Sequence, residues 1–298
     1  MAATRILLDA KDLINVVEHS NPVKLSEFDG WLRIREADLV YSLVNIRGLA
    51  APLALGSSFL PQVKDSLDQL ESLPHCFVTS GIDLLELQRA LDCFDAGNEY
   101  VAIDPYVPRF DYVFPRFANP RKLYYPMRDS VIDLWRACPN VFEPQPKYHT
   151  LQAIGMSMDR SRMAARQSSS EPPSEWIVEI LMLKMNVEEE RATQVASWIA
   201  ANPLRCPAMW LARAVGFSMS QNQSYAARKD DTFDMAEMWT IPYTDAATVD
   251  RSMLDLFSRA SRNLRRKDKS AGPRAKVYRT LSELMASGES AAVAATSA

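Results

Sequence analysis

The chain of 298 residues is 47% hydrophobic and 24% charged, which gives enough apolar material for a sizeable core and enough charge for solubility. Its formal net charge of -3 excludes a uniformly basic protein that coats nucleic acid, although it leaves room for a local basic patch. No apolar run is long enough to span a membrane and the N-terminus lacks a secretory pattern, so we expect a cytoplasmic protein without membrane contact.

Cysteine, histidine and glycine usage excludes several common kinds of site. The four cysteines and three histidines follow no metal-binding spacing, which argues against a zinc site, a disulfide framework and a catalytic triad. Only nine glycines occur, and none of them forms a glycine-rich phosphate loop. A nucleotide-binding Rossmann domain is therefore a poor fit.

Strand and helix signals alternate from the start of the chain. Residues 4–9 form a short apolar run that ends in an aspartate, and residues 10–18 carry apolar side chains at helical spacing. A helix is predicted over 26–35 with Ser26 as its N-cap, followed by an apolar strand over 39–43. This alternation predicts an α/β fold with a central parallel sheet.

The rest of the chain divides into a long insertion and a second α/β block. Proline-rich and aromatic-rich residues from 104 to 146 break regular elements and begin the insertion, and a serine-rich stretch at 160–173 is the best linker candidate. The further elements that we predict are a helix that ends near 73, a strand at 75–80, helices at 83–94, 176–185, 188–201, 207–215 and 230–241, a strand at 245–250, a helix at 252–264, and a strand at 276–280 before a turn.

Three aspartates are predicted to meet at one edge of the sheet. Asp9 closes the first strand, Asp250 closes a late strand, and Asp234 lies in the first turn of the helix that leads into that strand. Doubly wound sheets bind their ligands at the edge where the carboxyl ends of the strands lie. Clustered carboxylates need a positive counterpart, so this pattern favours Mg²⁺ or Mn²⁺ and metal-assisted phosphodiester hydrolysis. The alternative is that each aspartate is an ordinary strand-end or helix-capping residue.

Other acidic residues surround this predicted edge. Asp231 lies one helical turn before Asp234, which makes it a further candidate metal ligand, although a first-turn acid also stabilises the helix dipole. Asp12 and Glu237 are expected at the surface or behind the ligands. Asp245 begins its strand and is therefore expected at the opposite edge.

Three blocks of the chain resemble the PIN-domain family of metal-dependent ribonucleases. They are RILLDAKDLI, LVYSLVNIRGLAAPL and DDTFDMAEMWTIPYTDAATVDRSM, and they cover about the first 50 and the last 70 residues. In that family the first strand ends in an Asp, a later helix begins with an Asp, and a following strand ends in a T-x-D-R motif. Asp9, Asp234 and Asp250 match these positions, and Thr248 and Arg251 complete the last motif.

The resemblance implies a PIN-like three-layer fold with helical and aromatic-rich insertions. On this basis we expect one α/β domain over residues 1–285, with the insertion at about 104–215 and a disordered tail at 286–298. It also implies an endoribonuclease of the bacterial toxin or defence-effector type, with Mg²⁺ or Mn²⁺ as cofactor and RNA as substrate. A protein partner or a homo-oligomer is left open.

One position departs from the family pattern in a way that bears on activity. The family carries a glutamate on the helix after the second strand, where this chain has Gly48, and a small polar residue near the first Asp, where it has Lys11. We expect Gly48→Glu to raise metal affinity and cleavage and to improve helix propensity. Glu86 is a candidate replacement ligand, although its surroundings also fit a solvated helix face. The alternative function is a degenerate PIN-like protein that binds RNA or a protein partner without cleavage.

Two further features fit RNA binding but also have plainer explanations. A basic run follows the last motif and could hold phosphates, or it could be a solvated helix end; it comprises Arg259, Arg262, Arg265, Arg266, Lys267 and Lys269. Aromatic residues between 110 and 125 could stack on unpaired bases, or they could pack the insertion on the core. A third hypothesis, a structural interaction protein built on the helices from 176 to 215, makes the aspartates incidental.

Overall fold

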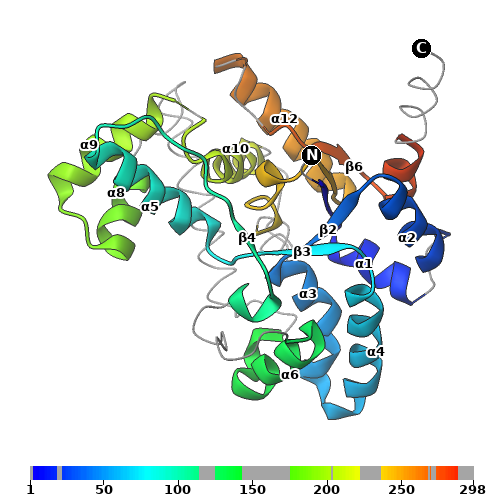
Figure 1. The fold of residues 1–298 in the computed structure, drawn as a ribbon. Helices are drawn as coiled ribbons and strands as arrows, with labels where there is room; N and C mark the ends of the chain where they lie inside the picture. The colour runs from blue at the N-terminus through cyan, green and yellow to red at the C-terminus, as the bar shows by residue number, and fades with distance from the viewer. Residues whose placement is uncertain are drawn as a thin grey trace.

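A computed structural model describes residues 3–18, 22–113, 125–142, 175–202, 204–221, 236–267, 269 and 273–287. Within these ranges six strands form one sheet with the order β4-β3-β2-β1-β5-β6 (Figure 1). The strands are β1 (Thr4–Leu7), β2 (Ala37–Tyr41), β3 (His75–Val78), β4 (Tyr106–Val107), β5 (Ala246–Thr248) and β6 (Lys276–Tyr278). Every neighbouring pair is parallel except β3 and β4, which confirms the predicted α/β fold with a mostly parallel sheet.

The strands from the two ends of the chain lie side by side. Ile6 of β1 pairs with Ala246 of β5, and Leu7 pairs with Ala247. From β1 the chain adds strands first toward β3 and later, after the long middle region, on the other side through β5 and β6. The direction of propagation therefore switches between β1 and β5, and open α/β sheets bind ligands at such a switch point.

Helices cover both faces of the sheet. One face packs against α1 (Ala10–Val17), α2 (Leu25–Ile34), α3 (Leu43–Ala50), α4 (Leu60–Glu71), α6 (Met127–Ala137) and a helix over residues 281–287. The opposite face packs against the start of α5 (Ile82–Asp95), α10 (Pro207–Gln221) and α12 (Arg251–Lys267). Beyond these layers α8 (Glu175–Met185) and α9 (Glu189–Ala200) pack on α5 and the start of α10. Short 3-10 turns complete the fold at Ala51–Leu55, Ser57–Phe59, Phe110–Val113, Pro139–Phe142 and Ile241–Tyr243.

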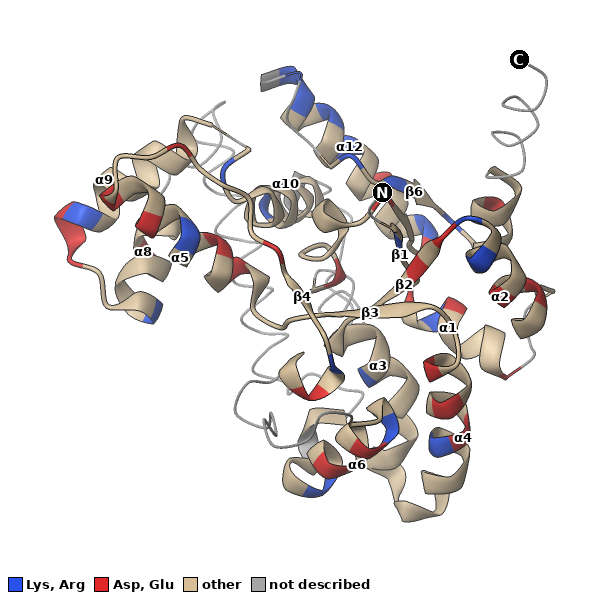
Figure 2. Ribbon diagram, in the orientation of Figure 1, with Lys and Arg blue, Asp and Glu red and all other residues tan. Residues whose placement is uncertain are grey.

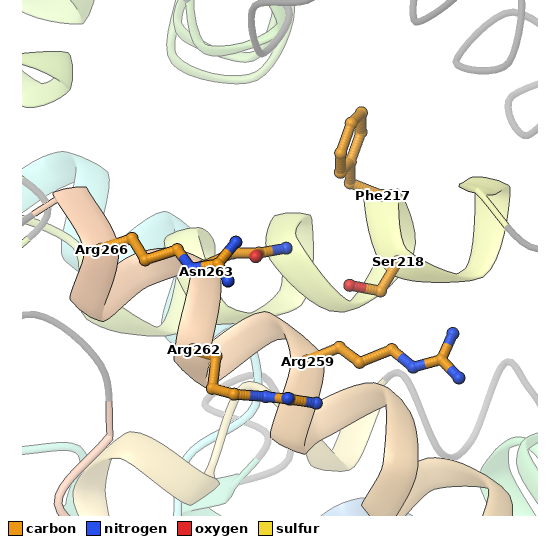
Figure 3. A pocket seen from close by; sticks show the side chains of 6 residues that line it. All are labelled: Phe217, Ser218, Arg259, Arg262, Asn263 and Arg266. Carbon is orange, nitrogen blue, oxygen red and sulfur yellow. The ribbon is translucent and has the colours of Figure 1, made fainter.

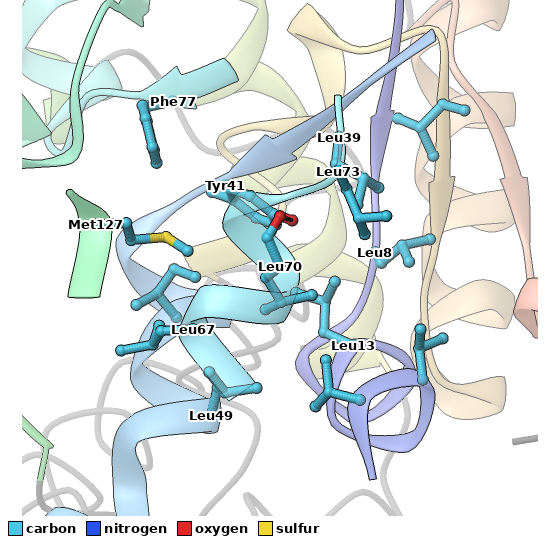
Figure 4. Close-up of a cluster of buried hydrophobic side chains, with 14 of the residues drawn as sticks. Leu8, Leu13, Leu39, Tyr41, Leu49, Leu67, Leu70, Leu73, Phe77 and Met127 are labelled. Carbon is cyan, nitrogen blue, oxygen red and sulfur yellow. Dashed lines mark hydrogen bonds between the residues drawn. The ribbon is translucent and has the colours of Figure 1, made fainter. Parts of the chain in front are cut away.

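The central strands are apolar on both sides, as continuous apolar runs predict for a covered parallel sheet. Leu39 and Tyr41 of β2 enter the core beneath α1, α3 and α4 (Figure 4), whereas Val40 between them enters the core beneath α10 and α12. Side chains alternate along a strand, so one short run supplies both cores. This arrangement fixes the register of the strands and hence the position of the residues that follow them.

Several local predictions are wrong. Ser26 is not an N-cap, because α2 begins at Leu25 and its N-cap residue Lys24 makes no side-chain cap. The segment after β6 is a helix over residues 281–287 rather than a turn, so the first two residues of the predicted tail are helical. The insertion at about 104–215 stays a prediction; residue 215 lies inside α10, whose buried side chains pack on the sheet.

Other predictions fall on parts of the chain that the structure does not describe. They are the linker at 160–173, the first half of the helix at 230–241, and the tail from residue 288 onward. In the described half of that predicted helix, only residues 236 and 237 are helical. In the described ranges no helix combines the length and the apolar character needed to cross a membrane.

Candidate functional site

Asp9 and Asp250 lie at the carboxyl ends of the adjacent parallel strands β1 and β5, as predicted. Each one also begins a helix. The side chain of Asp9 accepts a hydrogen bond from the Lys11 backbone N–H at 3.0 Å and caps α1. The side chain of Asp250 accepts hydrogen bonds from the Met253 N–H at 2.6 Å and from the Ser252 hydroxyl at 2.9 Å. Each aspartate therefore lies at the predicted edge of the sheet and also caps a helix, because the residue between a strand and the following helix can do both.

Thr248 connects the two strand ends. Its buried hydroxyl oxygen accepts a hydrogen bond from the Asp9 backbone N–H at 3.0 Å and its hydroxyl donates to the Asp12 carboxylate. Asp12 also accepts a hydrogen bond from the backbone N–H of Leu281, at the start of the last described helix. Asp12 thus lies beside Asp9 and is held by β5 and the C-terminal helix.

The negative charge of this edge is only partly compensated. Burial raises the pKa of Asp9, and the charges of Asp12 and Asp250 raise it further, against the lowering effect of the Lys11 N–H. Burial also raises the pKa of Asp12, against its hydrogen bonds from Thr248 and Leu281. Such a group of carboxylates gains from a bound proton or a bound cation.

The described residues supply part of a metal site. Asp9 is half-buried and Asp250 is exposed. Hard oxygen donors with uncompensated charge fit Mg²⁺ or Mn²⁺. Within the described ranges no group of three or more Asp, Glu, His or Cys residues is arranged to hold a metal ion. The predicted ligands Asp231 and Asp234 lie outside these ranges.

A buried amide beside this edge is not among the residues predicted from the sequence. The Asn45 side chain donates hydrogen bonds to the carbonyl oxygens of Leu8 at 3.4 Å and Val40 at 3.2 Å, and its oxygen accepts from the Ser42 N–H at 2.8 Å. It therefore ties the end of β1 to the end of β2, directly before Asp9. The signal that could have revealed it is the capping box formed by Ser42 and Asn45, three residues apart.

Gly48 of α3 lies where this helix contacts α1 closely. A Cβ atom built on it would lie 2.6 Å from the Cβ of Ala10, the first residue of α1. Gly48 therefore faces the helix that Asp9 caps, but no side chain fits there unless α1 moves. The expectation that a glutamate would improve this helix is wrong, because the steric overlap outweighs the gain in propensity.

Glu86 is neither a metal ligand nor a solvated residue. It is fully buried and its carboxylate accepts hydrogen bonds from the N–H groups of Ala208 at 2.8 Å and Met209 at 3.0 Å, and from the Tyr243 hydroxyl. Ala208 and Met209 belong to the first turn of α10, where backbone N–H groups have no partner within the helix. Glu86 is thus a structural cap. Glu237, expected at the surface or behind the ligands, is buried and therefore not at the surface.

The aromatic insertion packs on the core where it is described. Phe110 is buried and makes an edge contact with Phe77 of β3 at 5.9 Å between ring centres, and Tyr125 is buried as well. These positions favour packing over base stacking for the rings concerned. The other aromatic residues between 114 and 124 lie outside the described ranges.

Replacing Thr248 by Val is expected to lower the free energy of unfolding by about 1–3 kcal/mol, because the Asp9 N–H and the Asp12 carboxylate would lose a buried partner. Thr248→Ser keeps the hydroxyl and should lose less. Urea unfolding of the three proteins measures the difference. A larger loss for Ser, which lacks only the methyl group, than for Val, which lacks only the hydroxyl, would show that the methyl group and not the hydroxyl holds this edge together.

The site is thus defined by its position in the sheet and its charge. Two strand-end aspartates and Asp12 surround the point where the strand order switches, with Thr248 between them. Comparison with models of protein families, with curated protein sequences and with solved structures finds no match to this chain.

Proposed function

We propose that the protein is a PIN-like, metal-dependent endoribonuclease whose reaction takes place at the carboxyl ends of β1 and β5. The observation that carries this proposal is that Asp9 and Asp250 follow the carboxyl ends of the adjacent parallel strands β1 and β5, at the switch point of the sheet. The raised pKa of Asp9, caused by burial and by two neighbouring carboxylates, adds support because it marks a cation-seeking group.

Each residue has a defined part in this proposal. Asp9 and Asp250 would hold the metal ion, with Asp234 and Asp231 from the segment outside the described ranges as further ligands. Bound Mg²⁺ or Mn²⁺ polarises a phosphate and lowers the pKa of a water molecule. Thr248 and Asn45 are positioning residues, because they fix the ends of β5, β1 and β2 without supplying a free carboxylate.

Gly48 supports a second candidate function, an RNA-binding or protein-binding relative of this fold that does not cleave. The position that matches the family's glutamate has no room even for a Cβ atom. A site with one carboxylate fewer binds hard cations more weakly. The nuclease and the binding protein differ in one measurable property, which is metal-dependent cleavage.

We expect Asp9→Asn and Asp250→Asn each to reduce Mn²⁺-dependent cleavage of labelled single-stranded RNA by about 100-fold or more. Even changes to residues that only hydrogen-bond to a metal ligand lower metal affinity or activity by about 10–100-fold. The fold should survive, because asparagine also caps helices and the Asp9 change removes a carboxylate whose charge burial disfavours. Cleavage is followed on denaturing gels with Mn²⁺, with Mg²⁺ and with EDTA, and the thermal midpoint is recorded for each variant.

The matched control is Asp245→Asn. Asp245 directly precedes β5 at the opposite edge, where it accepts a hydrogen bond from the Arg5 N–H at 2.8 Å, and asparagine keeps an acceptor there. The control should cleave like the unmodified chain. Absence of cleavage by the unmodified chain with either metal would favour the binding protein, and equal cleavage by all variants would place the reaction elsewhere.

A further inference from the structure

Helix α12 carries a strongly basic face. Its 17 residues contain one acid, Asp255, and six basic residues, namely Arg251, Arg259, Arg262, Arg265, Arg266 and Lys267. Its apolar side chains recur at helical spacing and are buried against the sheet, as Met253, Phe257 and Leu264 show. The arginine side chains are therefore left on the outer side, and Figure 2 shows the basic positions gathered toward the end of the helix.

Three of these arginines line a groove. Arg259, Arg262 and Arg266, together with Asn263, face Phe217 and Ser218 of α10 across a cavity of about 260 Å³ (Figure 3). All three arginines are exposed, and the described lining contains no acidic side chain. Helix α10 adds no acid of its own.

In the part of the chain that the structure describes, these arginines also lack the ion pairs that other arginines make. Within the described ranges six other arginines pair with carboxylates: Arg33 with Asp29, Arg109 with Asp111, Arg128 with Asp68, Arg136 with Asp133, Arg191 with Asp95, and Arg279 with Glu283. Among the described residues no carboxylate lies within ion-pair distance of the three groove arginines. This includes Asp255, which lies one turn before Arg259 on the same helix. Like charges held together in this way repel one another and attract an anion.

The form of the groove points to a phosphate chain rather than a single anion. Guanidinium groups match phosphate oxygens with two parallel hydrogen bonds. From Arg259 to Arg266 the cationic side extends about 10 Å along the helix, which is more than one phosphate can contact.

We propose that this groove, lined by Arg259, Arg262, Arg266, Asn263 and Phe217, binds the backbone of single-stranded RNA. The choice of RNA rests on the proposed function. Helix α12 begins directly after Asp250, so the groove lies on the same rigid element as a candidate metal ligand, with Arg259 about 13 Å along the axis. A strand held in the groove would thus have its continuation near the carboxyl ends of β1 and β5.

The test measures binding separately from cleavage. A short fluorescein-labelled single-stranded RNA is titrated in EDTA, by anisotropy, over a range of salt concentrations. The triple variant Arg259→Gln, Arg262→Gln, Arg266→Gln is compared with the control triple variant Arg33→Gln, Arg136→Gln, Arg279→Gln, which removes the same charge from exposed ion pairs. Thermal unfolding verifies that both variants are folded.

The groove variant is expected to bind about tenfold more weakly or worse, with the slope of log affinity against log salt reduced by about 2, since each single-strand phosphate contact contributes about 0.7. The control should bind within about twofold of the unmodified chain. Equal losses of RNA affinity in both variants would show that net charge alone explains the effect, and would overturn the proposal. Competition by polyglutamate as strong as by RNA would overturn it too, in favour of an acidic peptide.

The two proposals fail in different ways. RNA binding in EDTA that depends on the groove, without cleavage in Mn²⁺, supports the proposal that the groove binds RNA and contradicts the proposal that the protein is a nuclease. If the groove variant retains full metal-dependent cleavage and unchanged RNA affinity, the result supports the proposed nuclease function and overturns the proposal that the groove binds RNA.

Discussion

Glu86→Ala is expected to lower the free energy of unfolding by about 3 kcal/mol or more at pH 5. The change removes the acceptor of three hydrogen bonds, those from the Ala208 N–H, the Met209 N–H and the Tyr243 hydroxyl, in a fully buried place. Each unsatisfied buried donor costs about 1–3 kcal/mol. Urea unfolding at several pH values measures the loss.

The same residue predicts how stability depends on pH. Burial raises the pKa of Glu86 from 4.5 to about 7, against the hydrogen bonds from Tyr243, Ala208 and Met209 that lower it. The folded state therefore binds this proton more tightly than the unfolded state. Its contribution to stability is fully present below pH 4.5 and is lost as the pH rises through about 7.

The difference between the unmodified chain and Glu86→Ala should accordingly shrink by about 2.5 kcal/mol between pH 5 and pH 8, because a tenfold change in an acid constant is worth about 1.36 kcal/mol. Asp92→Asn serves as the control, since Asp92 is an exposed acid on the same helix. It should change stability by less than about 0.5 kcal/mol at every pH. A difference independent of pH would mean that Glu86 is ionised throughout and that burial does not control its proton.

Gly48→Ala is the second change with a large expected effect, a loss of about 1–3 kcal/mol in the free energy of unfolding. An added Cβ would lie 2.6 Å from the Cβ of Ala10. Both atoms are attached directly to helix backbones, so the overlap is relieved only if α1 or α3 moves. Asp9 caps α1, and this movement would also displace the candidate site.

The contact can be tested from both sides. Ala10→Gly in the Gly48→Ala background removes the opposing Cβ and should restore part of the loss, as a double-mutant cycle measures. Gly30→Ala is the matched control, because Gly30 also lies in a helix but a Cβ added to it would meet no atom within 4 Å. It should gain up to about 1 kcal/mol. A similar gain for Gly48→Ala would show that the two helices are not in contact at this point.

This geometry changes how the missing glutamate is to be tested. Gly48→Glu alone combines a steric conflict with a new carboxylate, and a fall in activity would not separate the two. Gly48→Glu with Ala10→Gly gives the added side chain space at its base. Calorimetry with Mn²⁺ on this double variant then measures the effect of the carboxylate itself.

The strands, and the edge where the aspartates lie, follow from the order of the amino acids. Continuous apolar runs identify β1, β2 and β3, because strands covered on both faces have no polar side. An aspartate directly after such a run both ends the strand and begins the next helix, which places Asp9 and Asp250 at the carboxyl ends of their strands. The apolar run and the aspartate after it are local features of the sequence, so they can be recognised without knowing the tertiary structure.

Which of these local features meet depends on the folded chain. Glu86 and Ala208, Asp9 and Thr248, and Gly48 and Ala10 are distant in the chain, and no periodicity encodes their contact. An amphipathic pattern states that a helix has a buried side but not what lies opposite. For this reason the polar sequence around Glu86 resembled a solvated face, and the basic run of α12 became a groove only when α10 was placed against it.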